Sequence, residues 1–120
     1  MTGHEFDTAF GGTGIIKLGA WTVSPAPADM VACQATLAFD DRIVSLSATA
    51  TGPVGAMTSI LHDVGAPVQI ISLRQRETDD GITAFLLCER DNRQVWVYGN
   101  GTTSDEANVN ALVAGANRLR

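Results

Sequence analysis

Twice along this chain, a stretch of alternating apolar and polar residues gives way to a stretch in which apolar residues recur every three or four positions. The alternation is clearest over 31–39, where one face carries Val31, Cys33, Ala35, Leu37 and Phe39. A strand with one buried face needs a period of two, whereas a helix packed on a sheet needs a period near 3.6. The repeated switch therefore predicts antiparallel strands followed by a helix, in two successive units.

The first half of the chain is expected to hold three strands and one helix. A strand over 15–24 ends before Pro25 and Pro27, and the strand over 31–39 continues through a turn at Asp40-Asp41 into a third strand that begins at Arg42. Two strands joined by a tight turn form an antiparallel hairpin. A helix near 53–64 follows, with proline at its first position and an apolar stripe of Val54, Met57, Leu61 and Val64.

The second half repeats this order. Strands are expected over 68–74, 82–88 and 95–98, the last one broken by Gly99-Asn100-Gly101, and the uniformly apolar run 82–88 is typical of a well-covered strand. A helix near 104–118 begins at a capping box formed by Thr103 and Glu106. The third strands of the two halves begin 51 residues apart, at Arg42 and Arg93.

The predicted fold class is therefore α+β, with two pseudo-repeated βββα units, each a three-stranded antiparallel sheet with one helix. The glycine-rich residues 1–14 are expected to form a flexible N-terminal arm. Residues 15–120 form a single domain, divided into a first unit over 15–66 and a second unit over 67–120.

Composition excludes several classes of partner. The 120 residues carry a net charge of −5 and no cluster of Lys or Arg, so neither nucleic acid nor an anionic membrane is an expected partner. No segment is apolar enough to span a bilayer, and the N-terminus lacks the features of a signal peptide. Cys33 and Cys88 stand within apolar runs and are expected to be buried, reduced thiols, which indicates a cytoplasmic location.

The sequence offers little for catalysis. His4 and His62 are the two histidines, and neither they nor the cysteines have metal-ligand spacing. The segment Gly11–Gly14 lacks the Lys-Ser/Thr of a phosphate loop. We therefore expect no catalytic residue, metal or cofactor, and binding is favoured over catalysis, although a triad assembled from distant segments is invisible at this level.

Two features point to binding. Small residues run over 48–56 from a strand end into a helix start, where backbone N–H groups attract an anion such as the α-carboxylate of an amino acid. The alternative is a tight turn that binds nothing. Trp96 and Tyr98 stand on the face opposite Val95 and Val97, and serve either in core packing or in a protein contact.

An ordered set of segments resembles a known family: Ala50–Ala56, Asp63–Gly65, Val95–Gly99, Ala111–Val113 and Ala116–Arg118. In this order they are similar to the C-terminal regulatory, allosteric dimerisation domain of 2-isopropylmalate synthase, which citramalate and some homocitrate synthases also carry. The resemblance covers about residues 15–120. It implies two βββα units, a homodimer, and a branched-chain amino acid, leucine first, bound as a feedback inhibitor. The implied ligand-binding residues are Ala50, Thr51, Gly52, Pro53, Val54, Gly55, Ile70, Leu73, Ile82 and Ala84.

The chain also departs from this family. Where the family often has Gly-Asn-Gly-Pro, this chain has Ala50-Thr51-Gly52-Pro53, and Leu73 stands where an aromatic residue is common. The family's catalytic (β/α)8 barrel needs roughly 250 residues, so the chain is not expected to be an enzyme by itself. Its start at Met1 favours a free-standing relative over an excised domain. The alternative function is a structural module that has lost the ligand site and dimerises or docks on a separate catalytic subunit.

Overall fold

The computed structural model of the chain describes residues 16–39 and 42–120. The predicted arm over 1–14 and the turn at Asp40-Asp41 lie outside these residues. Two three-stranded antiparallel sheets, each followed by a helix, confirm the predicted α+β fold. In chain order the elements are β1 (Lys17–Ala26), β2 (Met30–Phe39), β3 (Arg42–Ala50), α2 (Pro53–Asp63), β4 (Gln69–Thr78), β5 (Gly81–Arg90), β6 (Arg93–Gly101) and α3 (Ser104–Arg118).

Each sheet is a meander with its second strand in the centre, in the orders β1-β2-β3 and β4-β5-β6. The tight turns use backbone conformations with positive φ, which give a hairpin the right twist. Asp91 and Asn92 adopt φ values of 53° and 65° between β5 and β6, and Gly81 has a φ of 135° after the β4–β5 turn. Turn chemistry therefore sets the register of these two hairpins.

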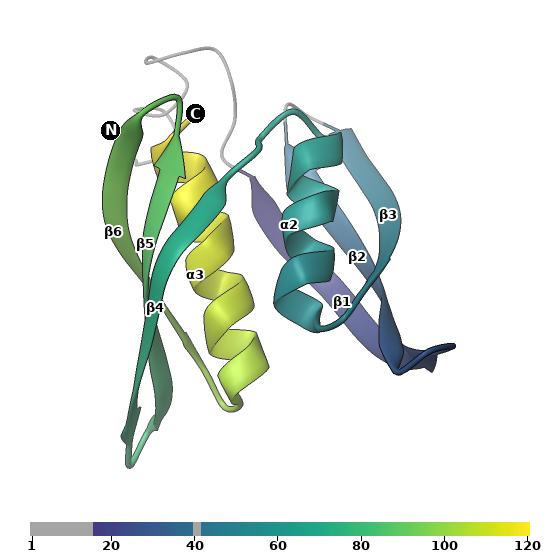
Figure 1. Cartoon of the computed structure of the whole chain (residues 1–120), viewed down its shortest axis with the longest axis horizontal. Coiled ribbons are helices and arrows are strands. Elements are labelled where there is room, and N and C mark those ends of the chain that lie inside the picture. The colour runs from purple at the N-terminus through teal and green to yellow at the C-terminus, as the bar shows by residue number, and fades with distance from the viewer. Residues whose placement is uncertain (1–15, 40–41) are drawn as a thin grey trace.

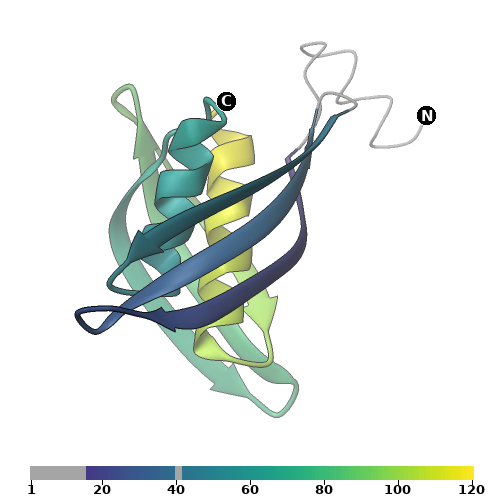
Figure 2. The ribbon, with the colours of Figure 1, turned by 90° about the vertical axis from the view of Figure 1, so that its right-hand side faces the viewer.

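The two helices lie between the two sheets (Figures 1 and 2). Helix α2 packs on β2, β3 and α3, whereas α3 packs mainly on β5 and β6. The inner faces of the central strands supply fully buried residues, among them Leu37 on β2 and Leu86 on β5. Asn117 of α3 joins the layers, because its side chain donates to the carbonyl of Ile16 and accepts from the Ile16 N–H. No helix of the described residues covers the outer face of either sheet.

The two units correspond closely. Strands β2 and β5, strands β3 and β6, and helices α2 and α3 all begin 51 residues apart. Strands β1 and β4 begin 52 residues apart, because the first turn is one residue longer. Each position of the first unit can therefore be compared with the position 51 residues later in the second unit, where a different side chain occupies an equivalent place in the fold.

Helix α3 lies unusually close to its sheet. A Cβ atom built on Gly99 would stand 2.2 Å from the Ala111 backbone nitrogen, and one on Gly101 would stand 2.6 Å from the Ala107 nitrogen. On the helix side, a Cβ on Gly115 would meet the Cys88 sulfur at 2.6 Å. Glycines on both surfaces thus allow the close approach, and alanines stand at the corresponding positions 48 and 50 of the first unit.

Three expectations need correction. Strand β1 runs through Pro25 to Ala26, because β1 is an edge strand and an edge tolerates a missing N–H. Strand β6 continues through Gly99–Gly101, since glycine there serves helix packing instead of ending the strand. Strand β5 is covered on one face, and Phe85 on the other face is 38% exposed.

Candidate functional site

The start of α2 is an uncapped helix end. Gly52 is the N-cap residue, so no side chain satisfies the first amides, and the first turn contains no acidic residue. Pro53 at the first position has no N–H, and the Ala56 N–H already binds the Gly52 carbonyl at 3.1 Å. The N–H groups of Val54 and Gly55 have no hydrogen-bond acceptor within residues 16–39 and 42–120. The helix therefore presents two free donors at its positive end.

Open space adjoins these two donors. A Cβ atom on Gly52 would meet nothing within 4 Å, and one on Gly55 would meet only the Ala50 side chain at 3.4 Å. Gly52 has φ and ψ of −163° and 170°, an extended conformation open to any residue. Small side chains here are thus not required by backbone strain or by packing, and they leave room for a ligand.

The start of α3 shows the opposite arrangement at the corresponding position. The Thr103 hydroxyl accepts a hydrogen bond from the Glu106 N–H at 3.1 Å, which confirms the predicted cap. The Glu106 carboxylate accepts from the Thr102 N–H at 2.9 Å, one residue earlier than in a standard capping box. Asp105 and Glu106 also bring negative charge to the first turn. In the second unit a side chain therefore binds one amide of the first helical turn, and two carboxylates there repel anions.

The structure divides the predicted ligand-binding residues into two groups. The first group, Ala50 to Gly55, forms one continuous segment at the start of α2, in which Thr51 and Gly55 are exposed and the other members are partly buried. The second group lies on the inner face of the β4–β5–β6 sheet, where Ile70 pairs with Cys88 and Leu73 with Leu86. Within it, Leu73 is 44% exposed, Ile70 and Ile82 are partly buried, and Ala84 is fully buried.

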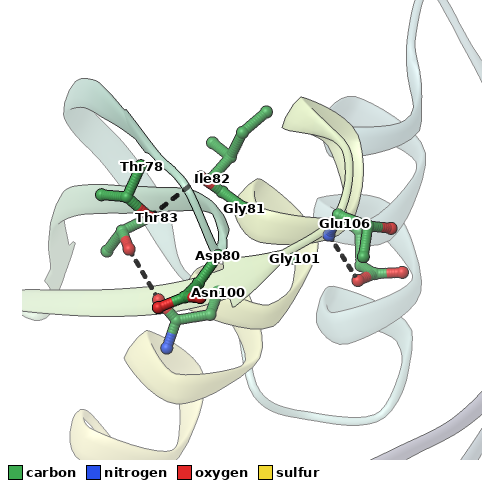
Figure 3. A pocket seen from close by; sticks show the side chains of 9 residues that line it. Thr78, Asp80, Gly81, Ile82, Thr83, Asn100, Gly101 and Glu106 are labelled. Carbon is green, nitrogen blue, oxygen red and sulfur yellow. Dashed lines mark hydrogen bonds between the residues drawn. The ribbon is translucent and has the colours of Figure 1, made fainter.

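A cavity of about 480 Å³ lies at the turn between β4 and β5 and the start of α3 (Figure 3). Of the predicted residues it includes Ile82, and its other lining residues are polar or glycine. The Thr83 hydroxyl donates to the Asn100 side chain at 2.7 Å, and the Thr78 hydroxyl donates to the Gly81 carbonyl at 3.3 Å. Carboxylates of Asp80 and Glu106 give the cavity negative charge. It is therefore poorly suited to an amino-acid carboxylate.

Sequence reasoning missed this cavity. Two segments, 78–83 and 100–106, form it, and the capping box in the second segment indicates a helix start and not a cavity. The 51-residue repeat could have pointed to this cavity. It places two of the lining residues, Gly101 and Thr102, at the positions of Ala50 and Thr51, which are predicted ligand-binding residues of the first unit.

No protein-family model matches the chain. A curated protein from Pseudarthrobacter chlorophenolicus, 2-isopropylmalate synthase, is 25% identical over 89 residues, or 71% of this chain. The protein of the same name from Clavibacter michiganensis is 27% identical over 92 residues, or 73% of this chain. That from Arthrobacter sp. (strain FB24) is 22% identical over 109 residues, or 88% of this chain. The chain is similar to part of 2-isopropylmalate synthase. It covers 15–19% of the length of these synthases.

Among the described residues, both cysteine thiols are withdrawn from solvent. Cys33 and Cys88 are both buried free thiols, as predicted. Burial raises the pKa of the Cys33 thiol, and it raises the pKa of the Cys88 thiol to about 11. Both thiols are therefore protonated at neutral pH, and a protonated thiol is a poor nucleophile.

The described part of the chain contains no group of three or more His, Cys, Asp and Glu side chains that could hold a metal ion. His62 lies exposed in the last turn of α2, and His4 lies outside the described residues. None of the helices in residues 16–39 and 42–120 is long and apolar enough to cross a membrane.

Proposed function

We propose that the chain is an amino-acid-binding regulatory domain of the kind implied by its similarity to 2-isopropylmalate synthase. The α-carboxylate of a branched-chain amino acid, leucine first, binds the N–H groups of Val54 and Gly55. The observation that carries this proposal is the uncapped, uncharged and open start of α2. The second unit closes the same position with Thr103 and Glu106, so an open helix end is not a requirement of the fold.

The chemistry of the site favours an α-carboxylate. Two backbone donors and a helix dipole attract a monoanion, and no carboxylate in the first turn competes with it. Val54 is partly buried beside these donors. Ile70 and Leu73 keep exposed apolar surface on the second sheet. Because β4 follows the C-terminal end of α2 and is not among its main packing partners, we assign the ligand side chain to Val54 and not to these two residues. The fully buried Ala84 supports packing and makes no direct contact in this proposal.

Regulation requires more than binding. A ligand shifts a conformational equilibrium only if its affinity for two arrangements differs. For this domain, the two arrangements are those of its assembly with another copy or with a catalytic partner. The proposal therefore separates into a binding step, which the isolated chain can show, and a coupling step, which requires the assembly.

The binding step is tested by titration calorimetry of the chain with leucine, isoleucine and valine. We expect heat of binding with leucine, and its loss in Gly55→Leu, whose side chain fills the space beside the amides. Ser59→Leu is the matched control, because Ser59 is exposed on the same helix one turn later and is expected to retain binding. Both variants are checked by circular dichroism and thermal unfolding.

A structural module without a ligand site is the second candidate function. It is favoured by the exposed aromatic residues Trp96 and Tyr98, which fit a docking role independent of any amino acid. The absence of heat with all three amino acids at millimolar concentration, from a folded chain, would leave this module as the better account.

A further inference from the structure

The outer face of the β4–β5–β6 sheet carries an aromatic patch at its centre. Cross-strand pairing places Trp96 beside Leu87 and Tyr98 beside Phe85. Trp96 is 51% exposed and Tyr98 is 64% exposed. The corresponding face of the first sheet carries mainly serine, threonine and alanine, with Ile43 as its large exposed apolar residue at 76%. An aromatic patch on one face alone marks an interaction surface.

Two arginines of β4 lie beside this aromatic patch. Arg74 pairs with Phe85, and Arg76 stands two residues further along the same strand. Within the part of the chain that the structure describes, neither arginine forms an ion pair, since the salt bridge found there lies at the β5–β6 turn. Glu89 lies at the opposite end of the face and accepts a hydrogen bond from Gln94 at 2.7 Å. The arginine end of the face therefore favours a partner that is acidic as well as aromatic.

The sequence that precedes the described residues has this chemistry. Residues 1–15 contain two of the chain's four phenylalanines, Phe6 and Phe10. They also contain Glu5 and Asp7, on either side of the first phenylalanine, and no lysine or arginine. Aromatic side chains gain free energy when they leave water. The segment 1–15 thus matches the outer face both in its apolar groups and in the sign of its charge.

This segment joins the fold at one end of the second sheet. The Ile16 N–H donates to the Asn117 side chain at 2.8 Å, close to the C-terminal end of α3. Arg93, the first residue of β6, donates to the carbonyl of Leu119 at 2.6 Å, just beyond the same helix end. Residues 1–15 therefore leave the described fold near the start of β6.

The order of groups along the segment matches the order along the face. Going away from Ile16, the sequence contains Phe10 and then Phe6 with its acidic neighbours. Going away from the start of β6, the face presents Trp96 and then Tyr98, whose row includes the nearer arginine. At about 3.3 Å per residue, the two phenylalanines reach up to about 20 Å and 33 Å from Ile16, whereas the two aromatic rings of β6 stand about 10 Å and 17 Å along the strand. The segment is long enough to pass the edge of the sheet and cover both rings.

We propose that residues 1–15 bind across the outer face of the β4–β5–β6 sheet of their own chain. Phe6 and Phe10 pack on the rings of the aromatic patch, and the acidic residues beside Phe6 lie against the arginines of β4. The covalent link gives the segment an effective concentration on the order of millimolar at the face. An interaction too weak to hold a separate peptide of this length is therefore sufficient within one chain, and it shields the patch from other molecules.

The fluorescence of Trp96 tests this contact in the full chain. Trp21→Phe leaves Trp96 as the single tryptophan, because the sequence contains two. In this background, Phe6→Ser combined with Phe10→Ser should shift the emission to the red and increase quenching by acrylamide about twofold, since the ring loses its cover. Phe6→Tyr combined with Phe10→Tyr is the matched control, because it keeps both rings, and it should leave quenching unchanged.

A peptide of residues 1–15 tests the same contact between separate molecules. Added to the Phe6→Ser, Phe10→Ser chain, it should restore protection of Trp96, with a dissociation constant on the order of 0.1 mM. Arg74→Glu combined with Arg76→Glu in that chain should weaken peptide binding at least about tenfold. Ile43→Glu places a charge on the outer face of the other sheet and should leave peptide binding unchanged. Circular dichroism confirms that each variant is folded.

Three results would overturn the proposal. The first is equal quenching of Trp96 in the serine variant and in the chain that keeps both phenylalanines. The second is protection that increases with protein concentration, because it assigns the face to another copy of the chain. The third is peptide binding that Ile43→Glu abolishes and the arginine variant retains. None of these measurements involves an amino-acid ligand, so they are independent of the proposed ligand site.

Discussion

Grafting the cap of α3 onto α2 should stabilise the chain and abolish its ligand binding together. The double variant Gly52→Thr, Gly55→Glu places the counterparts of Thr103 and Glu106 at the start of α2. Both positions have room for a Cβ atom, and the extended backbone of Gly52 accepts threonine. The new hydroxyl can then accept from the amide of residue 55, as Thr103 does from Glu106 in the second unit.

The expected gain can be estimated from its parts. Replacing Gly52 contributes about 0.5 kcal/mol, mainly by restricting the unfolded chain, since threonine and glycine are similar N-caps. Glutamate at position 55 adds about 0.5 kcal/mol through helix propensity and about 0.5 kcal/mol through the helix dipole. The sum of about 1.5 kcal/mol corresponds to a rise in Tm of roughly 5–10 °C for a chain of this size.

Urea unfolding and leucine calorimetry give the two readouts. Gly55→Ala separates the effects, because it adds helix propensity without a carboxylate and leaves most of the space open. A graft that lowers the free energy of unfolding would refute the claim that the start of α2 is unsatisfied and has room for the new side chains. A graft that stabilises the chain and still binds leucine would instead place the ligand elsewhere.

Three further predictions concern packing, pH and stoichiometry. Gly99→Ala should lower the free energy of unfolding by about 3 kcal/mol in urea, because its Cβ meets the α3 backbone, which cannot rotate away. Folding favours the neutral Cys88 thiol, whose pKa burial raises to about 11. Its contribution to stability is therefore complete below the ordinary thiol pKa and is lost as the pH rises through about 11, and Cys88→Ala should show a shallower alkaline loss of Tm. Calorimetry should give one leucine per chain and not two, since Asp105 and Glu106 make the corresponding position at α3 repulsive to a carboxylate.

Most of the fold was predictable from sequence, because hydrophobic periodicity and the residues at helix starts define most of its strands and helices. The helices predicted near 53–64 and 104–118 occupy 53–63 and 104–118, since a capping pair or a Gly-Pro step marks each start. The extent of β6 was not predictable in this way. Gly99 and Gly101 have low strand propensity, and they are required by the distance to α3, which is a tertiary property.

The same limit applies to β5 and to the candidate site. An apolar run such as 82–88 is compatible with a strand covered on both faces and with one that leaves Phe85 exposed. The segment over 50–55 was recognisable because the donors of a helix start and the small residues beside them are adjacent in the chain. Whether Ile70, Leu73 and Ile82 join them depends on how two helices and two sheets pack, and one-dimensional spacing carries no such information.

The contrast between the two helix starts identifies what distinguishes the two units. A buried or half-buried helix end must satisfy its first amides with a side chain, with water or with a ligand. In the second unit Thr103 and Glu106 satisfy amides at the start of α3, and the carboxylates add negative charge. In the first unit Gly52 and Gly55 contribute neither acceptors nor charge. Because the N-cap residue has an extended backbone in both units, this difference lies in side-chain choice, and of these two helix starts it leaves that of α2 suited to a carboxylate.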